Sequence, residues 1–196
     1  MGKLGKFDFV GLLGEHGALL SGHFRLSSGM HSSSYIQTAL LLQYPHISNK
    51  IAKAMAAKFP AEIDCVCSPA MGAVVIGQEV ARVKKCRAIF TERTGGSMSL
   101  RRDFHIERGE KILVVEDVLT TGRSTGEVVN LARQYGGKVV GVAAIVDRTV
   151  TTPSLDVPFR SLISYPLELY TPENCQLCKN GVPLTSPGSR YLEPAG

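Results

Sequence analysis

Two adjacent carboxylates stand directly after an apolar run in the middle of the chain. Glu116 and Asp117 follow residues 112–115, which read Ile-Leu-Val-Val. Two like charges at the tip of a buried strand repel each other and lose hydration, so they need hydroxyl donors or a cation nearby. A ribose diol, with or without Mg²⁺, supplies such a partner. The pair therefore indicates a site for a sugar-like ligand at a strand end.

The segment after this pair has the opposite chemical character. It combines small hydroxyl side chains, a glycine and an arginine in the order Val118, Leu119, Thr120, Thr121, Gly122, Arg123 and Ser124. A glycine lets the backbone turn tightly, and the free N–H groups at a helix N-terminus favour an anion. We interpret the segment as a phosphate-binding loop. The weaker alternative is an ordinary strand-to-helix turn, in which Thr121 or Ser124 caps the helix and Asp117 caps a turn.

Apolar runs and amphipathic segments alternate around these residues. The pattern predicts strands at 63–67, 86–91, 112–115 and 138–146, and helices at 72–84 and 124–135. Continuous apolar strands that alternate with amphipathic helices are typical of a parallel sheet covered on both faces. The sequence therefore predicts an α/β fold with a doubly wound parallel sheet, in which ligands bind at the carboxyl ends of the strands.

The two ends of the chain differ from this middle part. We expect a short helix within 7–18, strands or loop over 21–37, and an amphipathic helix between Pro45 and Pro60. Prolines accumulate beyond Thr149, which predicts an irregular extension with one strand near 159–169. A single domain over 1–196 is expected, divided into an N-terminal segment (1–45), an α/β core (46–150) and a C-terminal extension (151–196).

The composition is that of an ordinary globular protein. Of the 196 residues, 44% are apolar and 20% are charged, which excludes disordered, collagen-like and coiled-coil classes. The net charge of +5 suits an anionic ligand but is too small to indicate a nucleic-acid groove by itself. No apolar stretch reaches the roughly 18 residues of a membrane span, and no secretory signal is recognisable at the N-terminus.

The cysteines are odd in number, and three of the five lie in apolar segments. This usage fits a reducing compartment, so we expect a cytoplasmic protein. Cys175 and Cys178 have the spacing of half a zinc site. No second pair accompanies them, so we predict free thiols in a tail and assign no metal ligand to the protein. The alternatives are a redox-labile pair or a metal shared between subunits.

Residues 114–124, VVEDVLTTGRS, resemble the phosphoribosyl pyrophosphate signature of type I phosphoribosyltransferases. The resemblance implies that Glu116 and Asp117 hold the ribose hydroxyls. It also implies that the loop from Val118 to Ser124 wraps the 5′-phosphate.

Residues 7–150 further resemble the orotate phosphoribosyltransferases within that family. The segment Ser-Gly-His-Phe-Arg-Leu-Ser-Ser-Gly at 21–29, with His31 and Tyr35 after it, is similar to the segment that covers the pyrimidine in these enzymes. The resemblance implies orotate contacts for Ser28, Tyr35, Thr120 and Arg148, with the Arg148 fork facing the orotate carboxylate. The alternatives without a binding role are a polar surface hairpin at 21–37 and a surface Arg148 paired to Asp147.

Two segments depart from the family pattern. The loop of Ala70, Met71 and Gly72 resembles the pyrophosphate-binding loop, but Gly72 stands where many orotate enzymes carry a lysine, so backbone donors alone must serve. The segment 91–105 corresponds to the mobile catalytic loop, yet it contains no lysine. Its cations are Arg93, Arg101, Arg102 and His105, which leaves them an electrostatic role on the departing pyrophosphate; a solvated basic turn is the alternative.

The resemblance implies a complete reaction. The enzyme would transfer phosphoribosyl from 5-phospho-α-D-ribose 1-diphosphate to orotate, giving orotidine 5′-monophosphate and pyrophosphate in pyrimidine synthesis. Asp117, Arg101 and Arg102 are the expected catalytic residues, Arg93 is expected to bind the donor, and Mg²⁺ is expected to be bound mainly through the substrate. A homodimer with shared active sites is implied, without a nucleic-acid or membrane partner. The alternatives are a transferase for another base and a regulator that senses phosphoribosyl pyrophosphate.

Overall fold

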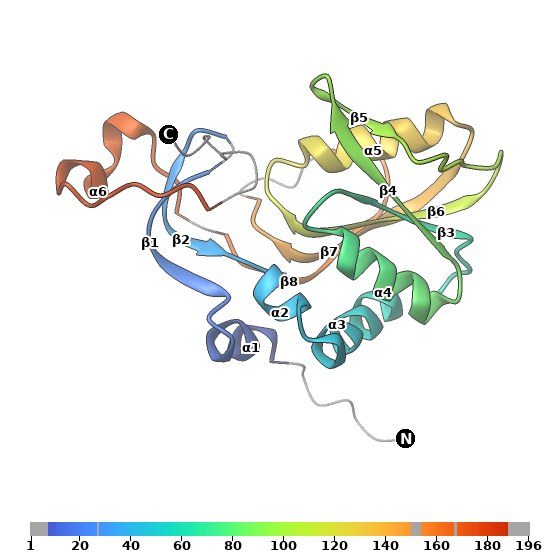
Figure 1. The fold of residues 1–196 in the computed structure, drawn as a ribbon, viewed down its shortest axis with the longest axis horizontal. Helices are drawn as coiled ribbons and strands as arrows, with labels where there is room; N and C mark the ends of the chain where they lie inside the picture. Colours follow the sequence, from blue (N-terminus) through green and yellow to red (C-terminus); the bar gives the residue numbers. More distant parts are fainter. Residues whose placement is uncertain (1–7, 27, 150–153, 167, 188–196) are drawn as a thin grey trace.

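The computed structural model describes residues 8–26, 28–149, 154–166 and 168–187 (Figure 1). Several expectations fall on positions outside these ranges: the start of the first helix at Phe7, and the prolines Pro153 and Pro194 of the C-terminal extension.

A six-stranded sheet forms the centre of the described structure. Its strands, in spatial order, are β5 (Ser97–Leu100), β4 (Arg87–Thr94), β3 (Cys65–Pro69), β6 (Lys111–Leu119), β7 (Lys138–Asp147) and β8 (Phe159–Ser164). All neighbours pair in parallel except β4 and β5. The predicted doubly wound α/β fold is confirmed, with an antiparallel strand added at one edge.

Helices cover both faces of this sheet. On one face lie α3 (Pro45–Ala57) and α4 (Val74–Lys84), and on the other lies α5 (Arg123–Gln134). Side chains that alternate along β3 divide between the two cores: Val66 packs toward α3 and α4, whereas Cys65 and Cys67 pack toward α5. No helix in the described ranges is long and apolar enough to cross a membrane.

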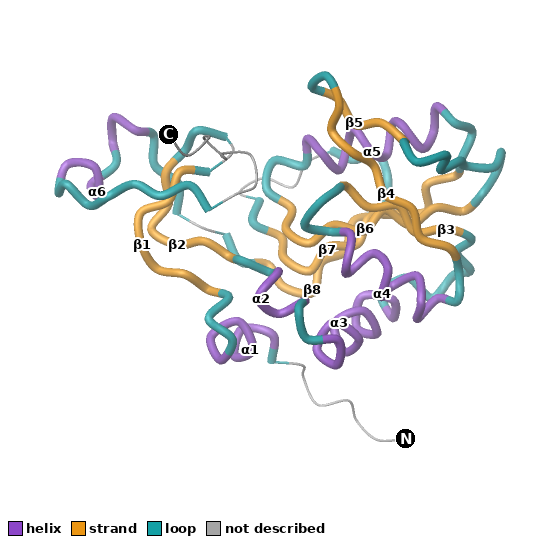
Figure 2. Tube along the Cα trace, viewed as in Figure 1, coloured by secondary structure: helices purple, strands orange, loops and turns teal. Residues whose placement is uncertain are grey.

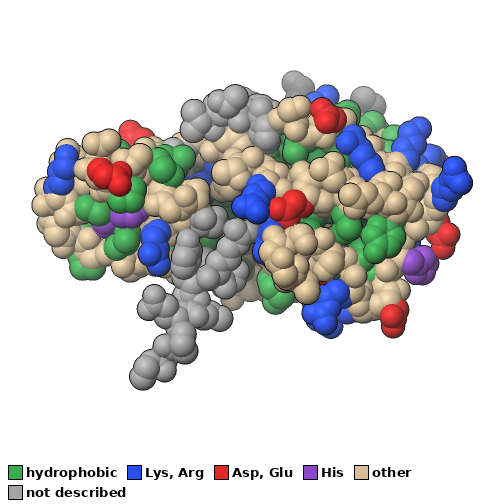
Figure 3. Space-filling view, turned by 90° about the horizontal axis from the view of Figure 1, so that it is seen from above, with side chains coloured by type: hydrophobic (Ala, Val, Ile, Leu, Met, Phe, Trp, Pro, Cys, Tyr) green, Lys and Arg blue, Asp and Glu red, His purple; other side chains and the backbone are tan. Residues whose placement is uncertain are grey.

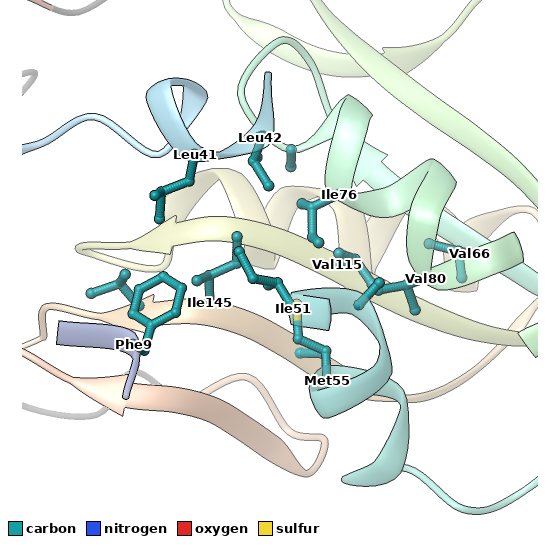
Figure 4. Packing of buried hydrophobic residues seen from close by; sticks show 14 of the residues in the cluster. Phe9, Leu41, Leu42, Ile51, Met55, Val66, Ile76, Val80, Val115 and Ile145 are labelled. Atoms are coloured by element: carbon teal, nitrogen blue, oxygen red, sulfur yellow. The ribbon is translucent and has the colours of Figure 1, made fainter. Parts of the chain in front are cut away.

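The core beneath α3 and α4 is aliphatic and closely packed. Figure 4 shows side chains from both helices meeting those of the sheet: Ile51, Met55, Ile76, Val80, Val115 and Ile145. Each of these is at most 1% exposed. The four-residue spacing that predicted α3 thus marks its buried face. This packing holds the carboxyl ends of the central strands in a fixed arrangement.

The segment expected to be a mobile catalytic loop begins as regular structure. Strand β4 continues to Thr94, turns at Gly95 and Gly96, and returns as β5. Both glycines have positive φ, 58° and 88°, which suits a tight two-residue hairpin. The loop interpretation was therefore wrong for residues up to Leu100, because a Gly-Gly pair between two extended segments is itself a hairpin signal.

A second, smaller sheet lies beside the main one. Strands β1 (Leu19–Arg25) and β2 (His31–Ile36) form an antiparallel hairpin, preceded by α1 (Phe9–Glu15) and followed by α2 (Ala39–Leu42). The expectation of short strands over 21–37 is confirmed.

The C-terminal extension is largely irregular, as expected, but it packs on this hairpin. It contains η1 (Pro172–Asn174) and α6 (Gln176–Lys179). Bridges join His31 to Tyr170 and Phe24 to Thr185. Figures 1 and 2 show this segment side by side with β1 and β2, away from α4 and α5. We call the hairpin 19–36 and residues 168–187 together the hood.

Candidate active site

The acidic pair lies at the carboxyl end of β6, in the middle of the sheet. Glu116 is 8% exposed, and both of its carboxylate oxygens accept hydrogen bonds. Oε2 accepts from Thr125 Oγ1 at 3.0 Å and Oε1 accepts from the Asp117 N–H at 3.2 Å. Burial raises the pKa of Glu116 well above its ordinary value, and the Asp117 carboxylate raises it further. Glu116 therefore braces the end of β6 from within.

The Asp117 side chain meets different partners. Thr38 Oγ1 donates to Asp117 Oδ2 at 2.7 Å, and Thr38 itself is buried. A Cβ at Gly72 would lie 2.6 Å from the same oxygen. Gly72 thus allows the loop after β3 to approach Asp117 closely, because any side chain at this position would meet the carboxylate. The Asp117 carboxylate also lies next to that of Glu116, which raises the pKa of Glu116.

The loop after β6 leads into the N-terminus of α5. Gly122 occupies the N-cap of α5 with a φ of 75°, and no side chain within the described residues caps this helix. The Thr121 hydroxyl accepts a long hydrogen bond from the Arg123 N–H, at 3.4 Å. Thr120 and Thr121 are exposed. Thr121 therefore makes one long hydrogen bond to the first residue of α5, and the N-terminal end of this helix favours an anion at the loop.

Two arginines are fixed beside this loop by one carboxylate. Arg93 Nη2 lies 2.9 Å from Glu127 Oε2 and donates to Ser124 Oγ at 3.2 Å, while Arg123 Nε donates to Glu127 Oε1 at 3.1 Å. Burial alone would raise the pKa of Glu127, but the hydrogen bonds from both arginines hold it below its ordinary value. The cations are thus placed at the predicted phosphate loop before any ligand arrives.

The other two loop arginines lie apart from this group. Arg102 donates to Glu92 Oε1 at 2.6 Å, and Arg101 Nη1 lies 3.5 Å from Glu92 Oε2. The Arg102 guanidinium also lies over the Phe90 ring, 5.5 Å from its centroid. Both arginine side chains are 61% exposed. The structure therefore brings Arg93 to the site but places Arg101 and Arg102 on the hairpin flank.

The loop after β3 supplies fewer backbone donors than expected. The Ala70 N–H donates to the Thr91 carbonyl at 2.8 Å, so it is not available to a ligand. The peptide bond between Ala70 and Met71 is cis, and the Met71 side chain is 76% exposed. The backbone N–H groups of Met71 and Gly72 remain as the candidate anion donors of this loop.

Arg148 follows β7 and is buried rather than superficial. It is 6% exposed, and its Nε has no hydrogen-bond partner among the residues that the structure describes. Burial lowers its pKa to about 10. The Asp147 carboxylate is engaged by the N–H and hydroxyl of Thr149, at 2.9 and 2.6 Å. The alternative of a surface Arg148 paired to Asp147 is therefore wrong.

Tyr35 connects this arginine to the acidic pair. Burial raises the pKa of the Tyr35 phenol, Asp117 raises it further and Arg148 opposes the rise. Tyr35 also packs against Phe24, with ring centroids 5.8 Å apart. The Tyr35 phenol thus lies within electrostatic reach of the Asp117 carboxylate and of the Arg148 guanidinium, whose Nε has no partner among the described residues. Ser28 lies in the turn at the opposite end of the hairpin from Tyr35, so the structure does not bring it to this group.

The sequence did not reveal the side chains that hydrogen-bond to the predicted site residues and orient them. Thr38, Thr125 and Glu127 position Asp117, Glu116 and the two arginines, respectively. Thr38 is 79 positions from Asp117, and no local pattern marks such a contact. Glu127 is four residues after Arg123 on α5, so this pair alone could have been found from helical spacing.

Comparison with known proteins places this geometry in a family. Residues 38–166 match the phosphoribosyl transferase domain family. The chain is 46% identical to an orotate phosphoribosyltransferase from Caldicellulosiruptor bescii, over 95% of this chain and 99% of that protein. It is also 46% identical to one from Caldicellulosiruptor saccharolyticus, over 97% of this chain and all of that protein.

A solved structure agrees with these relatives. The orotate phosphoribosyltransferase from Aeropyrum pernix superimposes with a TM-score of 0.68 at 25% identity, covering 79% of this chain and 92% of that one. The family match at 38–166 spans the acidic pair, the loop after β6 and Arg148. The chain belongs to the phosphoribosyl transferase family and, within it, to the orotate phosphoribosyltransferases.

Proposed function

We propose that this protein transfers the phosphoribosyl group of 5-phospho-α-D-ribose 1-diphosphate to N1 of orotate. The products are orotidine 5′-monophosphate and pyrophosphate. The observation that carries the base assignment is the buried Arg148, whose Nε has no partner within the described ranges, beside the Tyr35 ring. A planar carboxylate on a flat ring satisfies both groups at once, because a guanidinium fork binds carboxylates bidentately and an aromatic face stacks on a pyrimidine.

The donor would be held by the carboxyl ends of β6 and β3. Asp117 Oδ1 accepts from the ribose hydroxyls, while Thr38 fixes the other carboxylate oxygen. The 5′-phosphate occupies the open N-terminus of α5, beside the Arg93 and Arg123 side chains. The backbone N–H groups of Met71 and Gly72 face the pyrophosphate. Glu116 contributes indirectly, because its hydrogen bonds to Thr125 and to the Asp117 N–H fix the end of β6.

The chemical step breaks the bond between ribose C1 and a highly charged leaving group. Positive charge develops on the ribose ring, and Asp117 stabilises it electrostatically while it orients the sugar. Orotate N1 supplies the electron pair for the new bond and gives up its proton to water or to the departing pyrophosphate, which leaves with the electrons of the old bond. Such a transfer needs no covalent protein nucleophile. Exclusion of water from C1 prevents hydrolysis of the donor.

A magnesium ion fits this donor set. In the described site, Glu116 has both oxygens engaged and Asp117 has one engaged by Thr38, so the protein offers few free carboxylate oxygens. Mg²⁺ commonly binds through substrate phosphates and keeps few protein ligands. The ion would therefore be carried by the substrate, and Asp117 would hold it indirectly through the ribose hydroxyls. When bound, it neutralises charge on the leaving pyrophosphate.

Arg101 and Arg102 have a separate part in the proposal. Their side chains are exposed and share one carboxylate, Glu92, so a strongly anionic ligand can compete for them. We propose that they screen the pyrophosphate of a neighbouring subunit in a homodimer. The five free cysteines, two of which are fully buried in β3, fit the proposed cytoplasmic compartment.

The two alternatives predict other features. A transferase for a purine base has no need for a buried arginine aimed at a carboxylate. A regulator that binds nucleic acid needs a continuous basic surface. On the face shown in Figure 3, Lys and Arg side chains lie in separate groups with acidic side chains between them. This distribution favours the enzyme over the nucleic-acid-binding regulator.

The donor half of the proposal is tested by pyrophosphate release. Release should require orotate, phosphoribosyl pyrophosphate and Mg²⁺ together. Asp117→Asn removes the charge but keeps the shape, and should raise KM for the donor or lower kcat by at least about tenfold, since charged hydrogen bonds contribute roughly 1.5–3 kcal/mol. Unchanged kcat and KM in this variant would refute the ribose role of Asp117.

A further inference from the structure

The hood contains a second cluster of chemically reactive side chains, which the transfer reaction does not use. His23 from β1, His31 from β2, and Cys175 and Cys178 from the C-terminal segment point their ligand atoms at one another, and these atoms all lie within 4.8 Å. Cys175 is fully buried, and the two histidines are 3% and 4% exposed. The sequence showed no second pair beside these two cysteines, which are free thiols as predicted, but the fold brings two histidines from distant positions next to them.

Four of the six separations between these ligand atoms match the edges of a tetrahedral metal site. His23 Nε2 lies 3.1 Å from His31 Nδ1, 3.4 Å from Cys175 Sγ and 3.7 Å from Cys178 Sγ, and Cys178 Sγ lies 3.3 Å from His31 Nδ1. Zinc bonds of about 2.0–2.1 Å to nitrogen and about 2.3 Å to sulfur give edges of roughly 3.3 Å between nitrogens and about 3.6 Å between nitrogen and sulfur. These four distances agree with the edges within a few tenths of an ångström, and the two separations of Cys175 Sγ from Cys178 Sγ and from His31 Nδ1 are at most 4.8 Å.

The outer contacts of the cluster are also those of a ligand set. His23 Nδ1 lies 2.8 Å from the Val182 carbonyl, which can only accept a hydrogen bond. The proton of the ring therefore resides on Nδ1, and Nε2 presents its lone pair to the cluster. A ligating histidine typically donates its other N–H to a carbonyl in this way.

The C-terminal half of the hood has little else to hold it. Within the described stretch 168–187, Cys175 is the one residue that is buried, and the apolar side chains Leu169, Val182 and Leu184 are 37–42% exposed. Neither hydrophobic core cluster includes a described residue of this stretch. Apart from the bridges at Tyr170 and Thr185, this segment therefore lacks the apolar packing that normally fixes a chain in place.

We propose that His23, His31, Cys175 and Cys178 bind one structural zinc ion, which ties the C-terminal segment to the hairpin that carries Tyr35. Two imidazoles and two thiolates in a closed tetrahedron suit Zn²⁺, whereas Mg²⁺ and Ca²⁺ require oxygen ligands. All four positions are filled by protein, so the site stabilises the hood and takes no part in catalysis. The proposal does not depend on the identity of the base substrate.

The test is metal content of the full-length protein, purified without chelators from zinc-supplemented medium. Inductively coupled plasma mass spectrometry should find one zinc per chain in the wild type. The double variant Cys175→Ser/Cys178→Ser should lose at least about tenfold of that zinc. Cys86→Ser is the matched control, since Cys86 is a free cysteine outside the cluster, and it should keep the metal. A double variant that retains one zinc per chain would overturn the proposal.

A second measurement covers the case in which the double variant does not fold. The wild-type protein, stripped by a chelator and titrated with Co²⁺, should show thiolate-to-cobalt charge transfer and the intense visible bands of tetrahedral cobalt, with saturation at one equivalent. Stripped protein should also be cleaved by proteases within 168–187 faster than the zinc form. Absence of both zinc and cobalt binding, or a disulfide between Cys175 and Cys178 in the zinc-supplied sample, would contradict a zinc site.

Discussion

Replacement of Arg148 by methionine should weaken orotate binding and stabilise the free protein at the same time. The guanidinium is 6% exposed, and burial lowers its pKa to about 10 from an ordinary 12.5. A difference of this size corresponds to about 3 kcal/mol, at 1.36 kcal/mol for each pH unit. At neutral pH the side chain is charged in both the folded and the unfolded protein, so the folded state carries this cost until an anion arrives.

The two consequences have separate magnitudes. Arg148→Met removes a buried charge whose Nε has no partner among the described residues and keeps most of the side-chain volume, so the free energy of unfolding at pH 7 should rise by up to about 3 kcal/mol. Loss of a buried charged partner costs a ligand about 2–5 kcal/mol, which is a rise of roughly 30- to 4,000-fold in KM for orotate. KM for phosphoribosyl pyrophosphate should change little. Arg148→Lys keeps the charge but not the fork, and should lose orotate affinity without the gain in stability.

The assays are urea unfolding and initial rates of orotate consumption at saturating donor. Arg160→Met is the matched control, because Arg160 is an exposed arginine on the neighbouring strand β8. It should change neither KM nor the free energy of unfolding by more than about 0.5 kcal/mol. An unchanged KM for orotate in Arg148→Met would refute the carboxylate role. A large fall in its stability would refute the argument that the charge lacks a partner in the free protein.

The remaining predictions concern the acidic pair and the exposed arginines. Thr38→Val removes the hydroxyl that donates to Asp117 and keeps the side-chain volume nearly constant. We expect kcat/KM for the donor to fall roughly 10- to 100-fold while KM for orotate stays unchanged. Wild-type values of kcat and KM in this variant would show that the hydrogen bond from Thr38 does not position Asp117. Glu116→Gln tests the pKa of Glu116, which burial raises in the folded protein. Protonated Glu116 stabilises the wild-type fold below the ordinary glutamate pKa of 4.5, and this stabilisation is lost as the pH rises through the pKa of the folded protein. The free energy of unfolding of the variant should therefore rise relative to that of the wild type as the pH increases above about 4.5. A stability difference that stays constant with pH would contradict this. Arg101→Ala and Arg102→Ala should each lower kcat at least several-fold. An unchanged kcat in both variants would show that the two arginines belong to a solvated turn without a role in the reaction.

The sheet and its main helices could be predicted because their signals are local. The apolar run at 112–115 and the four-residue spacing of Ile47, Ile51 and Met55 both reflect the face that each element buries. The ends of some strands differ from the prediction because a residue can be buried without pairing in the sheet. Ile63, for example, is buried but precedes β3, which runs Cys65–Pro69. The edge strand β5 was missed because the family resemblance favoured a loop over the Gly-Gly turn.

The partners of the site could not be predicted, since they come from distant parts of the chain. Thr38 reaches Asp117 across 79 positions, and Cys175 reaches His23 across 152. The cysteine pair was read without its histidines because the hood that joins them is a tertiary arrangement, with no periodic pattern in its C-terminal half. The burial of Arg148 is likewise a property of the folded protein that no local pattern in the sequence records.

The central claim is the identity of the accepting base, and initial rates with three bases test it most directly. Equal concentrations of orotate, uracil and hypoxanthine are offered to the enzyme with saturating phosphoribosyl pyrophosphate and Mg²⁺, and pyrophosphate release is measured for each. Orotate should exceed both other bases by at least about 100-fold in kcat/KM, because only orotate supplies the carboxylate that Arg148 lacks. Comparable turnover with uracil or hypoxanthine would contradict the account.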